Sequence, residues 1–345
     1  MAGFTPSVKI SVIVTAHHRR HLLWEAVQSV LDQSISREDF EILVLKDWED
    51  REFDARLEQN GIAHLRPTGQ ALGAWIAQGL PWTSGQVVAF LDDDDRFLPG
   101  KLSHILHKFV SNPQLVYLHH AIRGVSPAHG VARGREPNAP GASETFQPLT
   151  PGFSFDGVWK KGPAFNLSSI VVRRDLIKED VGQLACIQVS VSAFLFYRAL
   201  VSKGYIEVDS GVWTAYGTPD GTLDSRGGPP FRDAGRLSAL SGPRAADAKI
   251  LLKLVESCPD PRARGPLEGA LASHTLVRIL EGKPCVRTDV VRALFWSLRT
   301  RGVRALVRER PLFGTAILFL IASRKARERW SHLVRSSDLP SSGFR

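Results

Sequence analysis

The chain of 345 residues has only three cysteines, Cys186, Cys258 and Cys285, which stand far apart. Their number is odd, and neither a CxxC pair nor a Cys/His zinc spacing occurs. This pattern argues against a disulfide-stapled scaffold and against a structural zinc site, and it is typical of a reducing compartment. We therefore expect a cytoplasmic protein.

Long apolar runs are also missing. No stretch of 18 uncharged apolar residues occurs, so the sequence predicts no ordinary membrane-spanning helix. Residues 1–9 lack a basic segment followed by an apolar core, so we expect no signal peptide. The remaining composition, 43% hydrophobic and 23% charged, is that of a globular protein.

The net charge of +9 is concentrated at one end of the chain. Residues 299–345 hold eleven Lys or Arg and three Asp or Glu, which leaves residues 1–298 almost neutral. Between the basic clusters, residues 311–322 (PLFGTAILFLIA) are too few to cross the ~30 Å hydrocarbon core of a bilayer. One interpretation is peripheral binding of 299–330 to an anionic membrane surface, at the inner face of the membrane. The alternative is a helix packed on the protein with a solvated basic rim.

The first 120 residues alternate between strand and helix patterns. Residues 8–15, 40–45 and 86–91 are short, β-branched and almost continuously apolar, as in strands buried on both faces of a parallel sheet. Residues 21–33 show apolar side chains along one helical face. Further elements are expected at 51–60, 62–65, 71–78, 100–110 and 115–119. The pattern predicts a doubly wound α/β domain with its ligand crevice at the carboxyl ends of the strands.

The second half of the chain is less regular. Residues 123–163 are rich in Gly, Pro, Ala and Ser without periodicity, which predicts a long loop that is functional or mobile. Strand patterns return at 168–172 and 205–215, with a helix at 189–201 between them. A Gly/Pro/Asp-rich stretch then marks a boundary, and the remaining chain is predicted to be helical. We therefore expect domains at 1–220 and 221–345.

Four consecutive carboxylates follow the third strong strand, as Asp92 to Asp95 in the segment VVAFLDDDDRFLPGKL. Carboxylates at the end of a buried strand repel one another and call for a cation. Oxygen ligands of this kind suit Mg²⁺ or Mn²⁺, which can in turn neutralise a diphosphate. The alternative is a solvated acidic turn before a helix. The strand edge favours the metal site.

These segments together resemble the family 2 glycosyltransferases of GT-A fold. SVIVTAHHRR, a helix ending in SVLDQ, EILVLKD and GQVVAFLDDDDRFLPGKL carry the resemblance, which covers residues 8 to about 216. It implies a doubly wound mixed sheet, a nucleotide-diphosphate sugar donor (UDP- or dTDP-sugar favoured), a divalent metal and inversion by direct displacement. It also implies a role in polysaccharide biosynthesis, with a glycan, lipid-linked or small-molecule acceptor.

The resemblance assigns site residues at three strand ends. The loop that holds the nucleoside corresponds to Thr15, Ala16 and His17, and the acidic position that contacts the base or ribose corresponds to Asp47. The DxD motif that holds the metal and diphosphate corresponds to Asp92 and Asp94, with Asp93 on the donor and Asp95 as a further metal ligand. The four-residue run equally permits Asp93 and Asp95 as the DxD pair.

One implied residue is missing. The family's general base is an Asp just before a helix, and the corresponding positions here are Val191 and Ser192, which cannot act as carboxylate bases. Replacements to consider are Asp156, Glu144 or a histidine, of which His120 lies nearest the acceptor side. A second hypothesis is a non-catalytic nucleotide-sugar-binding protein of the same fold. Nucleic acid is not an expected partner, because no known binding motif occurs.

Overall fold

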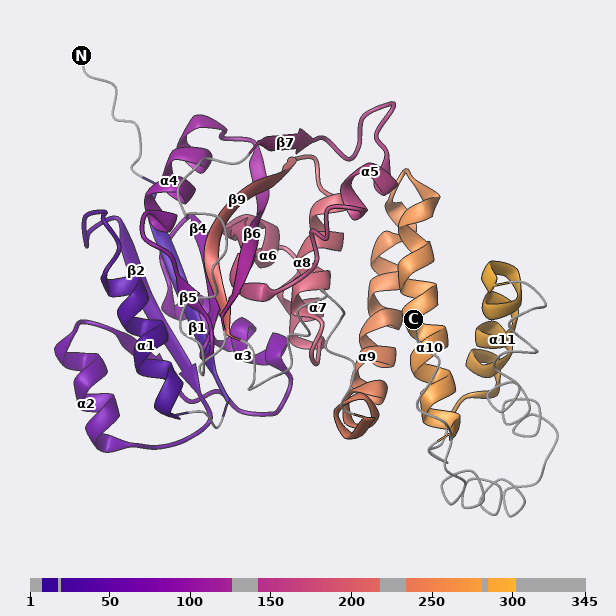
Figure 1. Ribbon diagram of the computed structural model, residues 1–345, viewed down its shortest axis with the longest axis horizontal. Helices are drawn as coiled ribbons and strands as arrows, with labels where there is room; N and C mark the ends of the chain where they lie inside the picture. The colour runs from indigo at the N-terminus through magenta and orange to yellow at the C-terminus, as the bar shows by residue number, and fades with distance from the viewer. Residues whose placement is uncertain (1–7, 18–19, 126–141, 218–233, 281–284, 302–345) are drawn as a thin grey trace. The chain divides into compact units, whose positions relative to one another are not determined.

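The computed structural model describes residues 8–17, 20–125, 142–217, 234–280 and 285–301 (Figure 1). The chain divides into two compact units. The first comprises Met1–Pro230 with Leu254–Arg262, and the second comprises Phe231–Lys253 with Ala263–Arg345. Each unit is described by itself.

The first unit is built on one mixed sheet in the order β3-β2-β1-β4-β8-β6-β9-β5, with β7 paired to β9. Strands β1 to β4 are mutually parallel, β8 is antiparallel to its neighbours β4 and β6, and β9 runs parallel to β6. The predicted mixed α/β sheet is therefore confirmed. The strands are β1 Ile10–Ala16, β2 Phe40–Lys46, β3 Ala63–Leu65, β4 Val87–Asp92, β5 Arg96–Phe97, β6 Leu115–Val125, β7 Ser143–Phe146, β8 Ile170–Arg173 and β9 Tyr205–Gly217.

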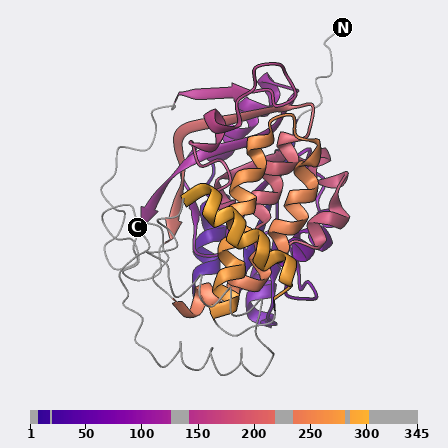
Figure 2. The ribbon, with the colours of Figure 1, turned by 90° about the vertical axis from the view of Figure 1, so that its right-hand side faces the viewer.

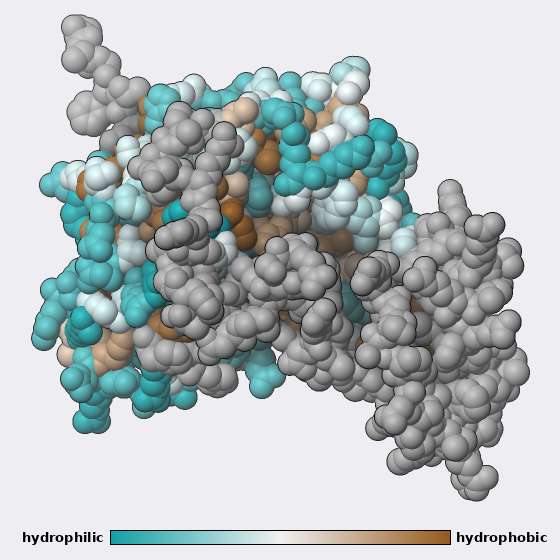
Figure 3. Space-filling view, in the orientation of Figure 1, coloured by the Kyte–Doolittle hydropathy of each residue, from teal (hydrophilic) through white to brown (hydrophobic). Residues whose placement is uncertain are grey.

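Helices cover both faces of the strong parallel strands. All seven residues of β1 are buried, which explains why its sequence carries no polar face. Burial of each Val, Ile or Leu side chain contributes about 1.5–3 kcal/mol to this core. On the space-filling surface, hydrophobic residues show near the middle of the face, with hydrophilic residues to the left of them and above (Figure 3). The helices of this part are α1 Arg20–Leu31, α2 Arg51–Gln59, α3 Leu72–Gly79 and α4 Lys101–Ser111.

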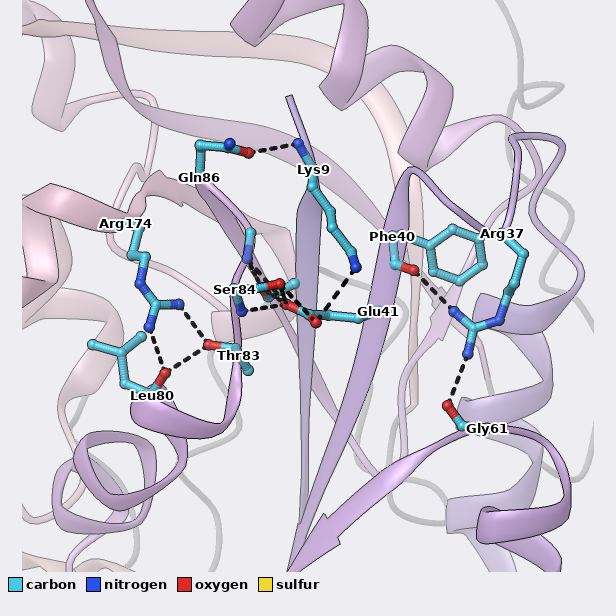
Figure 4. Close-up of polar contacts among 12 residues, drawn as sticks. Lys9, Arg37, Phe40, Glu41, Gly61, Leu80, Thr83, Ser84, Gln86 and Arg174 are labelled. Atoms are coloured by element: carbon cyan, nitrogen blue, oxygen red, sulfur yellow. Dashed lines mark hydrogen bonds and ion pairs between the residues drawn. The ribbon is translucent and has the colours of Figure 1, made fainter. Parts of the chain in front are cut away.

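A single carboxylate joins the strands at the amino-terminal edge of the sheet (Figure 4). Glu41, at the start of β2, accepts hydrogen bonds from the backbone amides of Ser84 (2.5 Å) and Gly85 (3.0 Å) and from the Ser11 hydroxyl (2.7 Å). Burial opposes ionisation of Glu41, but these hydrogen bonds outweigh it and lower the pKa of the carboxyl. The hydrogen bonds to Glu41 therefore connect the neighbouring segments at this edge of the sheet.

The segment predicted as one long loop over 123–163 contains regular structure, so that expectation is partly wrong. Strand β7 pairs with β9, and helix α5 Phe155–Trp159 begins at the cap Ser154. Trp159 packs on Phe196 and Tyr197 in an aromatic cluster, which anchors the helix. The composition hid both elements because they are only four and five residues long. Residues 126–141 lie outside the described residues.

Short helices α6 Arg174–Lys178 and α7 Val181–Ala185 and the longer α8 Val191–Leu200 complete the first unit. The second unit is helical, as predicted, with α9 Ala234–Leu254, α10 Arg264–Leu280 and α11 Arg287–Arg301. Helices α10 and α11 share an apolar core (Figure 2) that contains Leu276, Ile279 and Val290. Within the described ranges, no helix is long and apolar enough to cross a membrane. The basic segment from residue 302 onward lies outside those ranges.

Candidate functional site

The carboxyl ends of three neighbouring strands bring the predicted site residues together. Thr15 of β1 and Asp92 of β4 are direct partners in the ladder, and the Thr15 hydroxyl donates to Asp92 Oδ1 at 2.9 Å. Ala16 ends β1 and is fully buried, so the structure places it beneath this edge of the sheet. The strand order β2-β1-β4 places Asp47, which follows β2, on the other side of β1.

His17 connects the ends of all three strands. Its backbone amide donates to Asp93 Oδ2 at 3.1 Å, and its Nδ1 lies 2.5 Å from Asp47 Oδ2. The edge of the imidazole also contacts the Trp75 ring of α3, with 4.8 Å between centroids. Because the His17 side chain is 55% exposed while Asp47 is 14% exposed, the imidazole lies at the surface over a half-buried carboxylate. His18 lies outside the described residues.

The acidic run alternates in exposure. Asp93 and Asp95 are each 1% exposed, whereas Asp92 and Asp94 are partly exposed. Asp95 accepts hydrogen bonds from the Asn166 side-chain amide (3.0 Å) and from the backbone amide of Gly217 (2.9 Å). Asp93 and Asp95 therefore tie the turn to neighbouring segments, while Asp92 and Asp94 keep contact with solvent.

The run is electrostatically strained in the absence of a cation. Burial, together with repulsion from Asp95 and Asp94, raises the pKa of Asp92 to about 7, although the Thr15 hydrogen bond opposes this. Burial raises the pKa of Asp95 to about 6, against hydrogen bonds from Ser168 and Asn166. Carboxyl groups whose ionised forms are this unfavourable are suited to binding positive charge.

A buried lysine beneath the run was not foreseen from the sequence. Lys101, in the first turn of α4, is fully buried and donates to the Ser168 carbonyl (2.6 Å) and the Thr214 hydroxyl (2.9 Å). The Ser168 hydroxyl in turn accepts from the Asp92 amide at 2.9 Å. Burial lowers the pKa of Lys101 well below its usual value, and the Asp95 carboxylate opposes that shift. The sequence gives one sign of this buried contact, which is that Lys101 closely follows the acidic run along the chain.

One or two carboxylates of the run are suitable ligands for Mg²⁺ or Mn²⁺. Waters and substrate phosphates would complete the coordination. Asp92 and Asp94 are the partly exposed carboxylates of the run, and a cation would offset the burial and the repulsion that together raise the pKa of Asp92. Among the described residues, no group of three or more His, Cys, Asp or Glu side chains is arranged to hold a metal by itself. A site formed with the substrate agrees with both observations.

The helix that corresponds to the family's catalytic position begins without an acidic side chain. Val191 opens α8, and no Asp or Glu occurs in the first turn of that helix. The acidic pair Glu179 and Asp180 contacts Arg198 in the last turn of α8, where both carboxylates form ion pairs with the guanidinium. These two carboxylates therefore stabilise the helix from its far end.

The other candidates for a base are engaged elsewhere. His120 is fully buried, its Nδ1 lies 2.9 Å from the Ala121 carbonyl, and burial lowers the pKa of its imidazole well below the usual value. Asp156 forms an ion pair with Arg262 at 3.0 Å, and Glu144 pairs with Lys161 at 2.5 Å. Each of these contacts lies outside the acidic run.

Comparisons with known proteins show which proteins the chain is similar to in sequence and in fold. Residues 11–178 match the model of glycosyl transferase family 2. A protein of Nostoc sp. named as an uncharacterized glycosyltransferase is 33% identical over 119 residues, which is 33% of this chain and 36% of that protein. A second uncharacterized glycosyltransferase, of Rickettsia bellii, is 27% identical over 115 residues, or 32% of this chain and 16% of that protein. The matched segment thus spans about a third or less of either relative.

A solved structure shows the same fold over most of the chain. The crystal structure of residues 1–349 of S. aureus TarS superimposes with a TM-score of 0.50 at 15% identity, covering 95% of this chain and 87% of that one. The likeness establishes the GT-A arrangement with its helical C-terminal region. At 15% identity the likeness shows the fold alone, and the similarity to family 2 glycosyltransferases comes from the sequence matches.

Proposed function

We propose that this chain, whose residues 11–178 match family 2 glycosyltransferases, moves a sugar from a nucleotide-diphosphate donor to an acceptor with inversion. The favoured donors are UDP- and dTDP-sugars, and the acceptor is a glycan, a lipid-linked sugar or a small molecule. One observation carries the proposal. The partly exposed carboxylates Asp92 and Asp94 lie at the carboxyl edge of the sheet, next to the strand ends that hold His17 and Asp47.

The nucleoside end of the proposed site is formed by Asp47, His17 and Thr15. A carboxylate accepts hydrogen bonds only, which suits the N3–H of uracil or thymine and the ribose hydroxyls. His17 approaches one oxygen of Asp47 at 2.5 Å and so fixes the orientation of the carboxylate. The partly exposed imidazole provides a surface against which the base can pack.

The diphosphate end is formed by Asp92 and Asp94, which we assign as the DxD pair that holds Mg²⁺ or Mn²⁺. Their exposure supports this choice over the alternative pair, because Asp93 and Asp95 are 1% exposed and accept hydrogen bonds from the protein. When bound, the cation supplies positive charge to the departing diphosphate. The protein's own residues orient the carboxylates through Thr15 and through the backbone around Ser168.

A non-catalytic nucleotide-sugar-binding protein is the second candidate function. The first turn of α8 favours it, because the family's carboxylate base corresponds to Val191 and Ser192. If the protein is an enzyme, a group other than the side chains of Val191 and Ser192 accepts the proton of the acceptor hydroxyl.

Release of nucleoside diphosphate separates the two candidates. UDP-glucose, UDP-galactose, UDP-N-acetylglucosamine and dTDP-glucose are each incubated with the full chain, Mn²⁺ and a mixture of glycan acceptors. The enzyme releases UDP or dTDP faster with acceptor than without it. The binding protein shows calorimetric affinity for a donor without release. Absence of both binding and release contradicts the proposal.

We also propose that residues 299–330 bind an anionic membrane surface, which would bring a lipid-linked acceptor within reach. The support is the sequence alone: basic clusters flank the apolar segment 311–322. Co-sedimentation with phosphatidylglycerol vesicles tests the proposal. We expect binding by the full chain and its loss when residues 302–345 are deleted, and equal binding of both forms contradicts it.

A further inference from the structure

Two aromatic side chains lie on the side of the acidic run away from the nucleoside end. Phe165 is 49% exposed, and Tyr216, near the end of β9, is partly exposed. Their rings meet edge to face, with 6.0 Å between centroids and 61° between planes. Single exposed aromatic side chains are common on protein surfaces, so exposure alone assigns no role. Here two rings meet beside the acidic run, and this pairing is the observation that points to binding.

Asp95 fixes the segments that carry both rings. Its Oδ2 accepts from the side chain of Asn166, which follows Phe165, and its Oδ1 accepts from the amide of Gly217, which follows Tyr216. The two oxygens of one carboxylate therefore join the two aromatic residues to the end of the acidic run. The rings and the metal-binding carboxylates are held by the same turn.

The backbone at both positions is tightly constrained. Asn166 has a φ of 58°, the one positive φ of a non-glycine residue in the described part of the chain, and such conformations gather at binding sites. A Cβ on Gly217 would lie 1.9 Å from the Asp94 carbonyl oxygen, so only glycine permits this approach. The carbonyl of Phe165 also accepts from His119 Nε2 (3.0 Å) and the Ser169 hydroxyl (2.9 Å). The aromatic pair is thus positioned before any ligand arrives.

The strand order gives the pair its place along the donor. From β2 through β1 to β4, the edge presents Asp47, then His17, then Asp92 and Asp94. The next strand is β8, which Phe165 precedes, and β9 with Tyr216 follows two strands later. A nucleotide sugar laid along this edge has its nucleoside at β2 and β1 and its diphosphate at β4. Its sugar then lies at the aromatic pair, where the acceptor must also arrive.

We propose that Phe165 and Tyr216 form a subsite for a hexopyranose ring at the point of sugar transfer. A pyranose presents axial C–H groups on its faces and hydroxyls around its rim, so a half-exposed aromatic ring can pack on its face while the rim stays hydrated. This inference rests on the proposed function, since it requires a donor diphosphate at Asp92 and Asp94. The ring belongs to the donor or to the acceptor, and both share this chemistry.

Calorimetry in Mn²⁺ tests the subsite with UDP as an internal control. In the donor arm, each variant is titrated with UDP and with UDP-glucose, UDP-galactose and UDP-N-acetylglucosamine. In the acceptor arm, methyl glucoside, methyl galactoside and methyl N-acetylglucosaminide are titrated by NMR in the presence of UDP. The variants are Phe165→Ala, Tyr216→Ala and the conservative Phe165→Tyr. Trp82→Ala is the matched control, because Trp82 is an exposed aromatic (59%) at the end of the 3₁₀ turn Leu80–Trp82.

We expect Phe165→Ala to weaken sugar binding about five- to tenfold in one of the two arms, while UDP affinity changes less than twofold. Phe165→Tyr and Trp82→Ala retain wild-type affinity. Unchanged sugar binding in both arms overturns the subsite even when UDP binds normally, as does an equal loss of UDP and UDP-sugar affinity. Failure of the wild-type chain to bind UDP at all overturns the proposed function and the subsite with it, a pattern that is distinct from the other two.

Discussion

The two edges of the central sheet use carboxylates in opposite ways. At the amino-terminal edge, Glu41 accepts hydrogen bonds from three residues of neighbouring segments, and its pKa is lowered. At the carboxyl-terminal edge, Asp92 has one hydroxyl donor and three acidic neighbours, and its pKa is raised to about 7. Both carboxylates are partly buried, so exposure does not distinguish them.

The difference lies in what satisfies the negative charge. Donors from the protein complete the surroundings of Glu41, so that edge is structural. The carboxylates of the acidic run repel one another, and we propose that a cation from outside the chain offsets this repulsion when the site is occupied. The sign of the pKa shift and the hydrogen-bond partners therefore separate the two carboxylates. Glu41 is assigned to stability, and Asp92 is assigned to binding. The predictions below test that assignment.

The largest expected effect is on function at the carboxyl-terminal edge. Asp94→Asn should lower the rate of UDP release at least 100-fold, because it removes one charge from the proposed metal ligand pair. The melting temperature should stay the same or rise, since the substitution relieves repulsion within the run. A variant that loses activity only through unfolding would show a lower melting temperature, which contradicts the assignment.

The next effect is geometric. Gly217→Ala should lower activity about tenfold or more, because a Cβ at this position meets the Asp94 carbonyl at 1.9 Å and must displace the run. Gly182→Ala is the matched control, since a Cβ there meets no atom within 4 Å. Kinetic assays of both variants decide the matter: equal activity would show that the position of Asp94 is unimportant.

The amino-terminal edge should respond in stability alone. Glu41→Ala leaves the Ser84 and Gly85 amides without their acceptor and should cost about 1–3 kcal/mol in the free energy of unfolding. Urea denaturation measures this change, while the KM for the donor stays within twofold of wild type. A large rise in KM without loss of stability would break the distinction between the edges.

Titration should separate the edges by the sign of the slope. Because the folded pKa of Asp92 is raised above its unfolded value near 3.9, the folded state holds the extra proton between about pH 4 and 7. Its contribution to the stability of the metal-free protein therefore falls as the pH rises through that window. The lowered pKa of Glu41 gives the opposite sign, with stability lost as the pH falls. Urea denaturation at pH 5 and 7.5 should show that Asp92→Asn reduces the first dependence. The same measurement at pH 3 and 5 should show that the second dependence, which lies below the ordinary carboxyl pKa, is unchanged.

The smallest effect is expected at Asp156. This carboxylate pairs with the half-exposed Arg262, and surface ion pairs of this kind contribute little to stability. Asp156→Asn should change kcat less than twofold and leave the melting temperature almost unchanged. A kcat reduced 100-fold or more, with a shifted pH profile, would instead identify Asp156 as the missing base.

Sequence patterns predicted the elements that depend on local composition. Strands β1, β2 and β4 are continuous apolar runs, and the structure places Asp92 at the end of β4, where the pattern put it. The contact of Asp47 with His17 follows from the same parallel arrangement.

Features that depend on contacts between distant segments could not be read in this way. The two short elements β7 and α5 are held by β9 and by an aromatic cluster, so their own sequences carry little signal. Lys101 looks like a solvated residue in a helix, and only the fold shows that it is buried under Ser168 and Thr214. The pairing of Phe165 with Tyr216 likewise joins residues 51 positions apart, through Asp95.

The most direct test of the account is calorimetric titration of UDP into the wild-type chain, Asp94→Asn and Glu41→Gln, each with and without Mn²⁺. The account predicts that UDP binds the wild type and Glu41→Gln only when Mn²⁺ is present, and that Asp94→Asn loses this dependence together with most of its affinity. UDP binding that is equally strong without Mn²⁺, or unchanged in Asp94→Asn, would contradict the assignment of the carboxyl-terminal edge as a metal–diphosphate site.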